Sequence, residues 1–253
     1  SDGDLMEGVA SEAASIAGHL RLGKLTLIYD DNHITIDGDT ALSFSENVQG
    51  RFEAYGWHVV RVADGNDLAG IAAALDASIR ETARPTLIVL RTHIADPAPT
   101  KRGTAEAHGA PLGAEEIGRT KEIMGWPIEP RFFVPDDARE HWRASVERGA
   151  SLESAWRQRF ADYSAAHPET AAELERWLSG GLPEGWERAL AGLGPTSGAL
   201  ATRQASGLAL QALAAAVPNL VGGSADLGGS TGTTLTQGGT FGPTTSGRTF
   251  HWG

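Results

Sequence analysis

Residues 25–32 read Leu-Thr-Leu-Ile-Tyr-Asp-Asp-Asn, an apolar run of strand length that ends in three polar side chains. Such runs are typical of strands that are buried on both faces of a parallel sheet. The hydrophobic pattern predicts further strands at 57–62 and 86–92, and helices at 5–22, 45–55 and 67–82. Because helices and strands alternate, the sequence predicts an α/β fold with parallel strands and right-handed crossovers.

The pattern changes twice further along the chain. Prolines and glycines replace the hydrophobic period between residues 97 and 110, and the following segment is helical, acidic and rich in tryptophan. A new α/β pattern then begins, with a helix expected at 197–217, strands at 219–221 and 248–250, and a loop rich in glycine, serine and threonine between them. We therefore predict three parts, at residues 1–113, 114–195 and 196–253.

Composition excludes several classes of protein. The 253 residues include 21 Lys and Arg against 32 Asp and Glu, which gives a formal net charge of −11 and argues against general binding of nucleic acid or anionic membranes. The absence of cysteine excludes disulfide frameworks and thiolate metal sites. The apolar stretches are too short, or too often interrupted by charges, to span a membrane.

Asp2-Gly3 stands before the first expected helix, and Asn32 follows the strand that ends near residue 31. Both positions fall at the carboxyl edge of a parallel sheet, where ligands bind in α/β proteins. A carboxylate, an amide oxygen and the Ile34 carbonyl would suit Mg²⁺, which would keep other positions for phosphate oxygens or water. The alternative is an ordinary turn at Asp2-Gly3 and a solvated loop at 30–32.

Three further residues are candidates for phosphate or sugar contacts. His108 lies in a glycine-flanked loop, where an imidazole can donate to a phosphate, although most loop histidines are simply exposed. Arg203 and Ser230 could hold a terminal phosphate; Arg203 could equally be a solvated arginine at a helix start. Glu7, taken alone, is a carboxylate that favours the first turn of a helix.

Several separate motifs resemble the transketolase family of thiamine-diphosphate enzymes. Together they are spread over nearly the whole chain, in the family's order. The matching stretches are Ser-Asp-Gly-Asp-Leu-Met-Glu-Gly at 1–8, Ile-Tyr-Asp-Asp-Asn-His-Ile-Thr-Ile-Asp-Gly at 28–38, and the segments 51–59, 107–113 and 222–227. The resemblance implies a thiamine-diphosphate-binding fold of parallel sheets flanked by helices, with two domains that are both incomplete. Residues 1–113 would be the C-terminal part of the diphosphate-binding domain, 114–195 a helical linker, and 196–253 the N-terminal part of the pyrimidine-binding domain.

The same resemblance implies roles for individual residues. Asp2, Asn32 and the Ile34 carbonyl would bind Mg²⁺, while Gly3 and Asn32 would contact the cofactor diphosphate. His108 would be a catalytic residue that contacts both cofactor and sugar. The remaining assignments are Arg203 and Ser230 as contacts to the substrate phosphate, and Glu7 as an acidic residue in the cofactor network at the dimer interface.

The implied activity is transfer of a two-carbon ketol unit from xylulose 5-phosphate to an aldose phosphate such as ribose 5-phosphate, through a carbanion of thiamine diphosphate. A cytoplasmic homodimer in the pentose phosphate pathway is expected. The chain resembles a fragment that lacks both ends; the family's catalytic glutamate would follow Gly253, and the piece alone is expected to be inactive. The alternatives are a related thiamine enzyme (a dihydroxyacetone synthase or a phosphoketolase) and a non-catalytic partner of the same fold.

Overall fold

The computed structural model describes residues 1–194 and 198–253, and it divides into two compact units, Ser1–Phe133 and Val134–Gly253. The expected boundary at 195/196 and the expected helix start at 197 lie outside the described residues. None of the helices in the described ranges is long and apolar enough to cross a membrane. The α/β class predicted from the sequence is confirmed.

In the first unit, three parallel strands form a sheet in the order β1-β5-β4, with β5 in the centre. The register pairs Tyr29 with Val89, and Val89 with Arg61. The elements are α1 (Asp2–Met6), α2 (Gly8–His19), β1 (Thr26–Asp31), β2 (Ile34–Thr35), β3 (Gly38–Asp39), a 3-10 turn η1 (Thr40–Leu42), α3 (Val48–Ala54), β4 (His58–Val62), α4 (Leu68–Arg80), β5 (Thr86–Arg91), α5 (Glu106–Gly109) and α6 (Ala114–Ile123).

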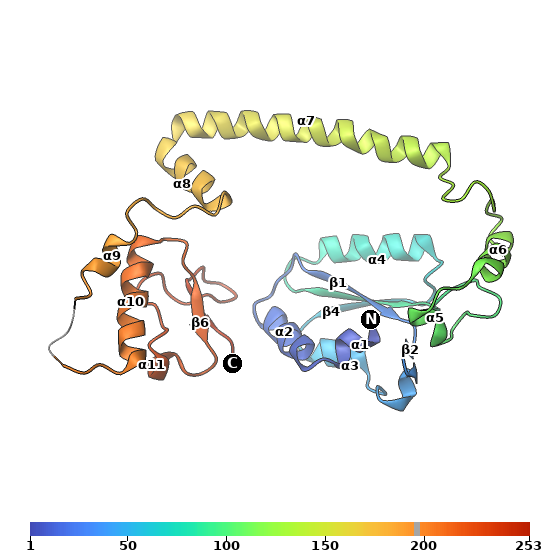
Figure 1. Ribbon diagram of the computed structural model, residues 1–253, viewed down its shortest axis with the longest axis horizontal. Helices are drawn as coiled ribbons and strands as arrows, with labels where there is room; N and C mark the ends of the chain where they lie inside the picture. The colour runs from blue at the N-terminus through green and yellow to red at the C-terminus, as the bar shows by residue number, and fades with distance from the viewer. Residues whose placement is uncertain (195–197) are drawn as a thin grey trace. The chain divides into compact units, whose positions relative to one another are not determined.

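Helices cover both faces of this sheet, as Figure 1 shows, with α4 on one face and α1, α2 and α3 on the other. Because side chains alternate along a strand, Leu87 and Val89 of β5 pack with the first three helices, whereas Ile88 packs with α4. The larger core cluster contains Phe52 and Trp57, whose rings meet edge to face at 5.1 Å between centroids. The sheet is thus the middle layer of three.

Two sequence expectations are wrong in detail. β1 is not buried on both faces: it pairs only with β5 among the described strands, and Leu27 and Ile28 are 37% and 49% exposed. The helix expected at 5–22 is two helices, because Glu7 is extended (φ −69°, ψ 133°) between α1 and α2. Gly8, which follows the break, has a weak helical preference that favours an interruption there.

Trp57 offers a test of the core. Its indole nitrogen donates a 2.8 Å hydrogen bond to the Ala14 carbonyl, and the side chain is 3% exposed. Trp57→Phe is expected to destabilise the protein by about 2 kcal/mol, because the indole hydrogen bond to the Ala14 carbonyl is lost and part of the ring volume becomes a cavity. Urea unfolding of the natural protein measures this. Trp142→Phe, at an exposed position, should change little, and equal effects of both variants would contradict the prediction.

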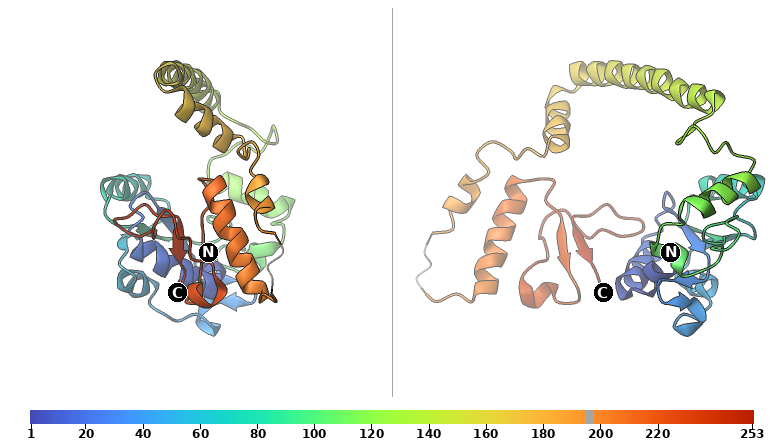
Figure 2. Two further views of the ribbon diagram at one scale, coloured as in Figure 1. Left: turned by 90° about the vertical axis from the view of Figure 1, so that its left-hand side faces the viewer. Right: turned by 45° about the vertical axis from the view of Figure 1, so that its right-hand side comes forward.

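The second unit begins with the 31-residue helix α7, which packs against α8 and has no buried residue. Its elements are α7 (Asp136–Ala166), α8 (Pro168–Leu178), α9 (Arg188–Ala191), α10 (Thr202–Ala216), β6 (Gly222–Ser224), α11 (Gly228–Thr231) and β7 (Thr249–His251). β6 and β7 pair in parallel and lie side by side (Figure 2).

The strand expected at 219–221 instead begins three residues later, as β6. Its pairing requires glycine, because a Cβ on Gly223 would lie 1.8 Å from the Phe250 carbonyl oxygen. Arg248 holds the same region together: its guanidinium donates to the carbonyls of Ala214, Val217 and Leu220 at 3.0, 2.9 and 2.8 Å. One side chain therefore joins the end of α10 to the start of both strands.

Candidate functional site

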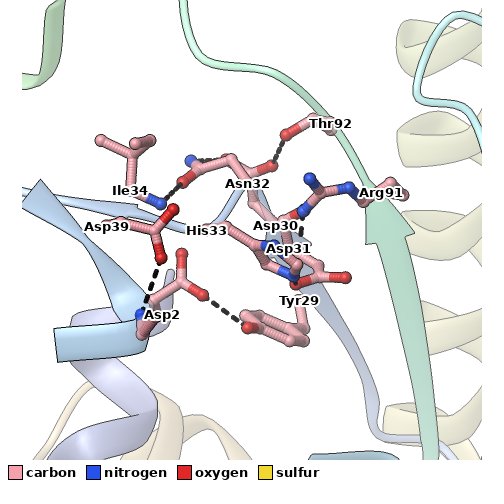
Figure 3. Close-up of polar contacts among 11 residues, drawn as sticks. Asp2, Tyr29, Asp30, Asp31, Asn32, His33, Ile34, Asp39, Arg91 and Thr92 are labelled. Atoms are coloured by element: carbon pink, nitrogen blue, oxygen red, sulfur yellow. Dashed lines mark hydrogen bonds and ion pairs between the residues drawn. The ribbon is translucent and has the colours of Figure 1, made fainter. Parts of the chain in front are cut away.

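Asp2 is the most deeply buried charged residue of the described chain, with 1% of its surface exposed. It lies at the start of α1, which contacts β1 and β2. The Tyr29 hydroxyl donates a 2.5 Å hydrogen bond to its Oδ1, whereas Oδ2 is buried without a hydrogen-bond partner in the described residues (Figure 3). Since an unpaired buried carboxylate oxygen is costly, Oδ2 indicates a place for a cation.

The chain turns back directly after β1, at Asn32, His33 and Ile34. His33 adopts the left-handed conformation with a φ of 62°, which is uncommon outside glycine. The turn lets the Asn32 side-chain oxygen accept a 2.9 Å hydrogen bond from the Ile34 amide, while the Asn32 amide group donates to Asp30 at 3.1 Å. Figure 3 shows the turn and the Asp2 carboxylate within one close-up, consistent with the contact of α1 with β2.

Polar side chains at the ends of two neighbouring strands fix this turn. The buried Asp31 carboxylate contacts the His33 ring at 3.0 Å and lies 3.9 Å from the Arg91 guanidinium. Arg91 also donates to the Asp31 carbonyl at 2.9 Å, and the Thr92 hydroxyl donates to Asp30. The ends of β1 and β5 are therefore locked together beside Asn32.

These residues fit a hard divalent cation. No group of three or more His, Asp or Glu suited to a metal occurs in the described residues, so a cation here would not be enclosed by carboxylates. Asp2 offers one free carboxylate oxygen, Asn32 an amide oxygen with a second lone pair, and Ile34 a main-chain carbonyl. Mg²⁺ binds oxygen ligands and keeps several positions for water or phosphate, which matches this small set.

The other residues of the first unit that the sequence suggested as site residues are more exposed to solvent than Asp2. A Cβ on Gly3 would meet nothing within 4 Å, so no neighbour in the described structure explains the glycine. Glu7 is exposed and occupies the N-cap position of α2 rather than lying inside a helix; its side chain makes no capping hydrogen bond, although a carboxylate is favourable near a helix start. His108 is exposed in α5, and within the described residues its ring makes no hydrogen bond to Asp2 or Asn32.

A buried carboxylate anchors the loop that leads to His108. Glu116 of α6 accepts hydrogen bonds from the amides of Thr100 and Lys101 at 2.6 and 3.1 Å. Lys101 in turn contacts Glu106, the first residue of α5. The hydrogen bond from the Thr100 amide, with a smaller contribution from the Lys101 amide, holds the pKa of Glu116 below its ordinary range.

The lowered pKa predicts pH dependence. Glu116 stabilises the loop fully above the ordinary value of 4.5, and this contribution is lost as the pH falls through the lower folded-state pKa. Glu116→Gln should weaken the anchoring of the loop at neutral pH, because a neutral amide oxygen is a poorer acceptor than a carboxylate. It should also remove the pH dependence of loop opening, because the amide does not titrate. Hydrogen exchange at the Thr100 and Lys101 amides measures this. Glu115→Gln, an exposed neighbour, should behave as wild type; unchanged exchange in Glu116→Gln would refute the anchor.

In the second unit, Arg203 and Ser230 line one pocket of about 640 Å³. Arg203 lies in the first turn of α10, and the Ser230 hydroxyl donates to the Leu227 carbonyl at 3.1 Å, which leaves its lone pairs free to accept. Gln204 and Gln211 line the same pocket. Arg203 and Ser230, which the sequence suggested as a pair, thus line the same cavity in the structure.

Sequence reasoning missed Tyr29, Asp31 and Glu116. Tyr29 and Asp31 are the two buried positions of β1, two residues apart, so they share one face of the strand. Reading 25–29 as one apolar run concealed this alternation. Glu116 gave no signal, because its role depends on a loop sixteen residues earlier in the chain.

The fold and the site define an α/β protein that presents oxygen ligands at the carboxyl edge of a parallel sheet, where such proteins bind their ligands. The family model described as "Transketolase, thiamine diphosphate binding domain" matches residues 1–183, and "Transketolase, pyrimidine binding domain" matches residues 198–253. The chain belongs to the transketolase family.

Individual transketolases are also similar to this chain in sequence and structure. Transketolase of Geobacillus stearothermophilus is 52% identical over 243 residues, which are 96% of this chain and 36% of that protein. Transketolase of Bacillus subtilis is 46% identical over 95% of this chain and 36% of its own length. The solved transketolase of Leishmania mexicana matches with a TM-score of 0.93 and 40% identity, over 100% of this chain and 38% of that one. The chain therefore spans little more than a third of these relatives.

Proposed function

We propose that the natural protein is a transketolase, a transferase that moves a two-carbon ketol unit from xylulose 5-phosphate to ribose 5-phosphate. The main support is the buried, unpaired Oδ2 of Asp2 beside the 32–34 turn, in a chain that matches the family's thiamine-diphosphate-binding domain. A solved Pichia stipitis transketolase in complex with sedoheptulose 7-phosphate, the product of that transfer, matches with a TM-score of 0.92 and 40% identity.

In this proposal Asp2, Asn32 and the Ile34 carbonyl hold Mg²⁺, and Gly3 and Asn32 contact the diphosphate. Thiamine diphosphate, when bound, supplies the electron sink that allows the bond next to a ketose carbonyl to break and form. The protein's contribution is orientation: a cation fixed by buried ligands sets the position of the diphosphate. The openness around Gly3 lets a phosphate approach the main chain there.

His108 contacts the cofactor and the sugar as a catalytic residue, since an exposed imidazole can donate to a hydroxyl or a phosphate near neutral pH. Arg203 and Ser230 hold the terminal phosphate of the sugar, because a guanidinium pairs with phosphate oxygens and the pocket leaves room for it. Glu7 belongs to the cofactor network at the dimer interface.

The remaining parts of the proposal concern organisation. The chain comprises part of the diphosphate-binding domain at 1–113, a helical linker at 114–195 and part of the pyrimidine-binding domain at 196–253. The protein acts as a cytoplasmic homodimer in the pentose phosphate pathway. Its acidic composition fits a protein that binds anionic sugars only at placed cationic groups.

The test is formation of sedoheptulose 7-phosphate from xylulose 5-phosphate and ribose 5-phosphate by the natural full-length protein. Thiamine diphosphate and Mg²⁺ are added together, singly, or withheld. Product that forms only when both are present supports the proposal. Absence of product from protein that binds the cofactor would overturn the proposed substrates.

A further inference from the structure

The hydroxyl of Tyr29 makes a contact that the packing of its ring does not require. The side chain is 5% exposed, and the ring belongs to the core cluster that also includes Leu5 and Val89. A phenylalanine would fill nearly the same space and suit a strand equally well. The hydroxyl, however, is the only hydrogen-bond donor to the Asp2 side chain among the described residues.

Resting on the proposed function above, we propose that Tyr29 is a positioning residue for the cation. Its hydroxyl binds Oδ1 of Asp2, which stops the carboxylate from rotating and directs Oδ2 toward the cation. The two oxygens of one buried carboxylate thus have different tasks, as Figure 3 makes visible: one is tied to β1 and the other is left free. Mg²⁺ tolerates little deviation from octahedral geometry, so the direction of a ligand oxygen affects affinity.

The contact between Tyr29 and Asp2 is outer-sphere with respect to the proposed cation, because the phenol hydroxyl binds the carboxylate and not the cation itself. Outer-sphere partners of this kind typically change metal affinity by about 10–100-fold when they are removed.

The experiment is a titration of the natural full-length protein with Mg²⁺, first alone by calorimetry and then with thiamine diphosphate by tryptophan fluorescence. Tyr29→Phe is expected to weaken Mg²⁺ binding by about 10–100-fold, with binding recovered at high Mg²⁺. Tyr55→Phe is the matched control, since Tyr55 packs against Phe52 in the same cluster and its hydroxyl makes no hydrogen bond within the described part of the chain. It should bind Mg²⁺ as the wild type does.

Two isosteric replacements separate donation from packing. With 4-aminophenylalanine at position 29 the donor returns and affinity should return with it, whereas 4-methylphenylalanine fills the same space without a donor and should not restore affinity. This pair also decides the matter if Tyr29→Phe does not fold. Equal Mg²⁺ affinity for the amino and methyl side chains would overturn the inference. If the wild type binds Mg²⁺ but not thiamine diphosphate, the proposed function fails while the comparison at Tyr29 still stands.

Discussion

Asp2→Ala in the natural protein is expected to abolish magnesium-dependent binding of thiamine diphosphate. The loss should exceed the roughly 10–100-fold that removal of an outer-sphere partner produces, because Asp2 supplies the only carboxylate of the proposed ligand set. Its Oδ2 is buried and has no hydrogen-bond partner among the described residues, so its removal leaves no donor of that part of the chain unpaired. Fluorescence titration with the cofactor at fixed Mg²⁺ measures the effect.

The same variant should change the stability of the metal-free protein little, because two effects oppose each other. Alanine removes a buried carboxylate with one unpaired oxygen, which is favourable, but it also removes the acceptor of the buried Tyr29 hydroxyl. Addition of Mg²⁺ and thiamine diphosphate should therefore raise the unfolding temperature of the wild type but not of Asp2→Ala. Asp4→Ala, an exposed position on the same helix, is the control and should bind the cofactor normally. If Asp2→Ala bound thiamine diphosphate with wild-type affinity in the presence of Mg²⁺, Asp2 would not be a ligand of the metal.

Arg248→Met is expected to lower the stability of the second unit by about 3 kcal/mol. The guanidinium donates to three main-chain carbonyls at the end of α10 and before β6. Hydrogen bonds from a charged donor are worth about 1.5–3 kcal/mol each, but Arg248 is only partly buried, so water replaces part of what the three bonds contribute. A cation near the last turn of α10 also interacts favourably with the helix dipole. Hydrogen exchange at the amides of 222–224 gives the local free energy of opening.

Two controls define this result. Arg157→Met removes an exposed ion pair with Glu153 on α7 and should change stability by less than about 0.5 kcal/mol. Arg248→Lys keeps the charge but not the planar fork, so it should recover only part of the loss. If Arg157→Met and Arg248→Met have the same effect, the three carbonyl contacts contribute nothing beyond surface charge.

The local hydrophobic pattern predicts the class of fold but not the neighbours of each strand. Periodicity alone places β1, β4 and β5 and the helices α3 and α4 within a few residues. It cannot tell that β5 occupies the centre and β1 an edge, because strand order depends on contacts between distant segments. The late start of β6 has a similar cause: Gly223 is required by the carbonyl of Phe250, which lies 27 positions further on.

The candidate site, like the fold, could be predicted from the sequence only in part. The polar residues that follow β1 predict where ligands gather, and the structure places Asp2 close to them through the contacts of α1 with β1 and β2. The partners that orient these ligands were not predictable: Tyr29 looked like part of an apolar run, and Arg91 like the end of a strand. Such partners are recognised only when the strands are assembled.

The single carboxylate at the proposed cation site has an electrostatic consequence. A divalent cation held by Asp2, Asn32 and a carbonyl keeps one uncompensated positive charge, since the amide and carbonyl oxygens are neutral. The cation then attracts an anionic ligand, and a diphosphate in turn strengthens the hold on the cation. By thermodynamic reciprocity each raises the affinity of the other by the same factor. The small ligand set proposed around Asp2 thus couples the binding of the metal to the binding of the anion.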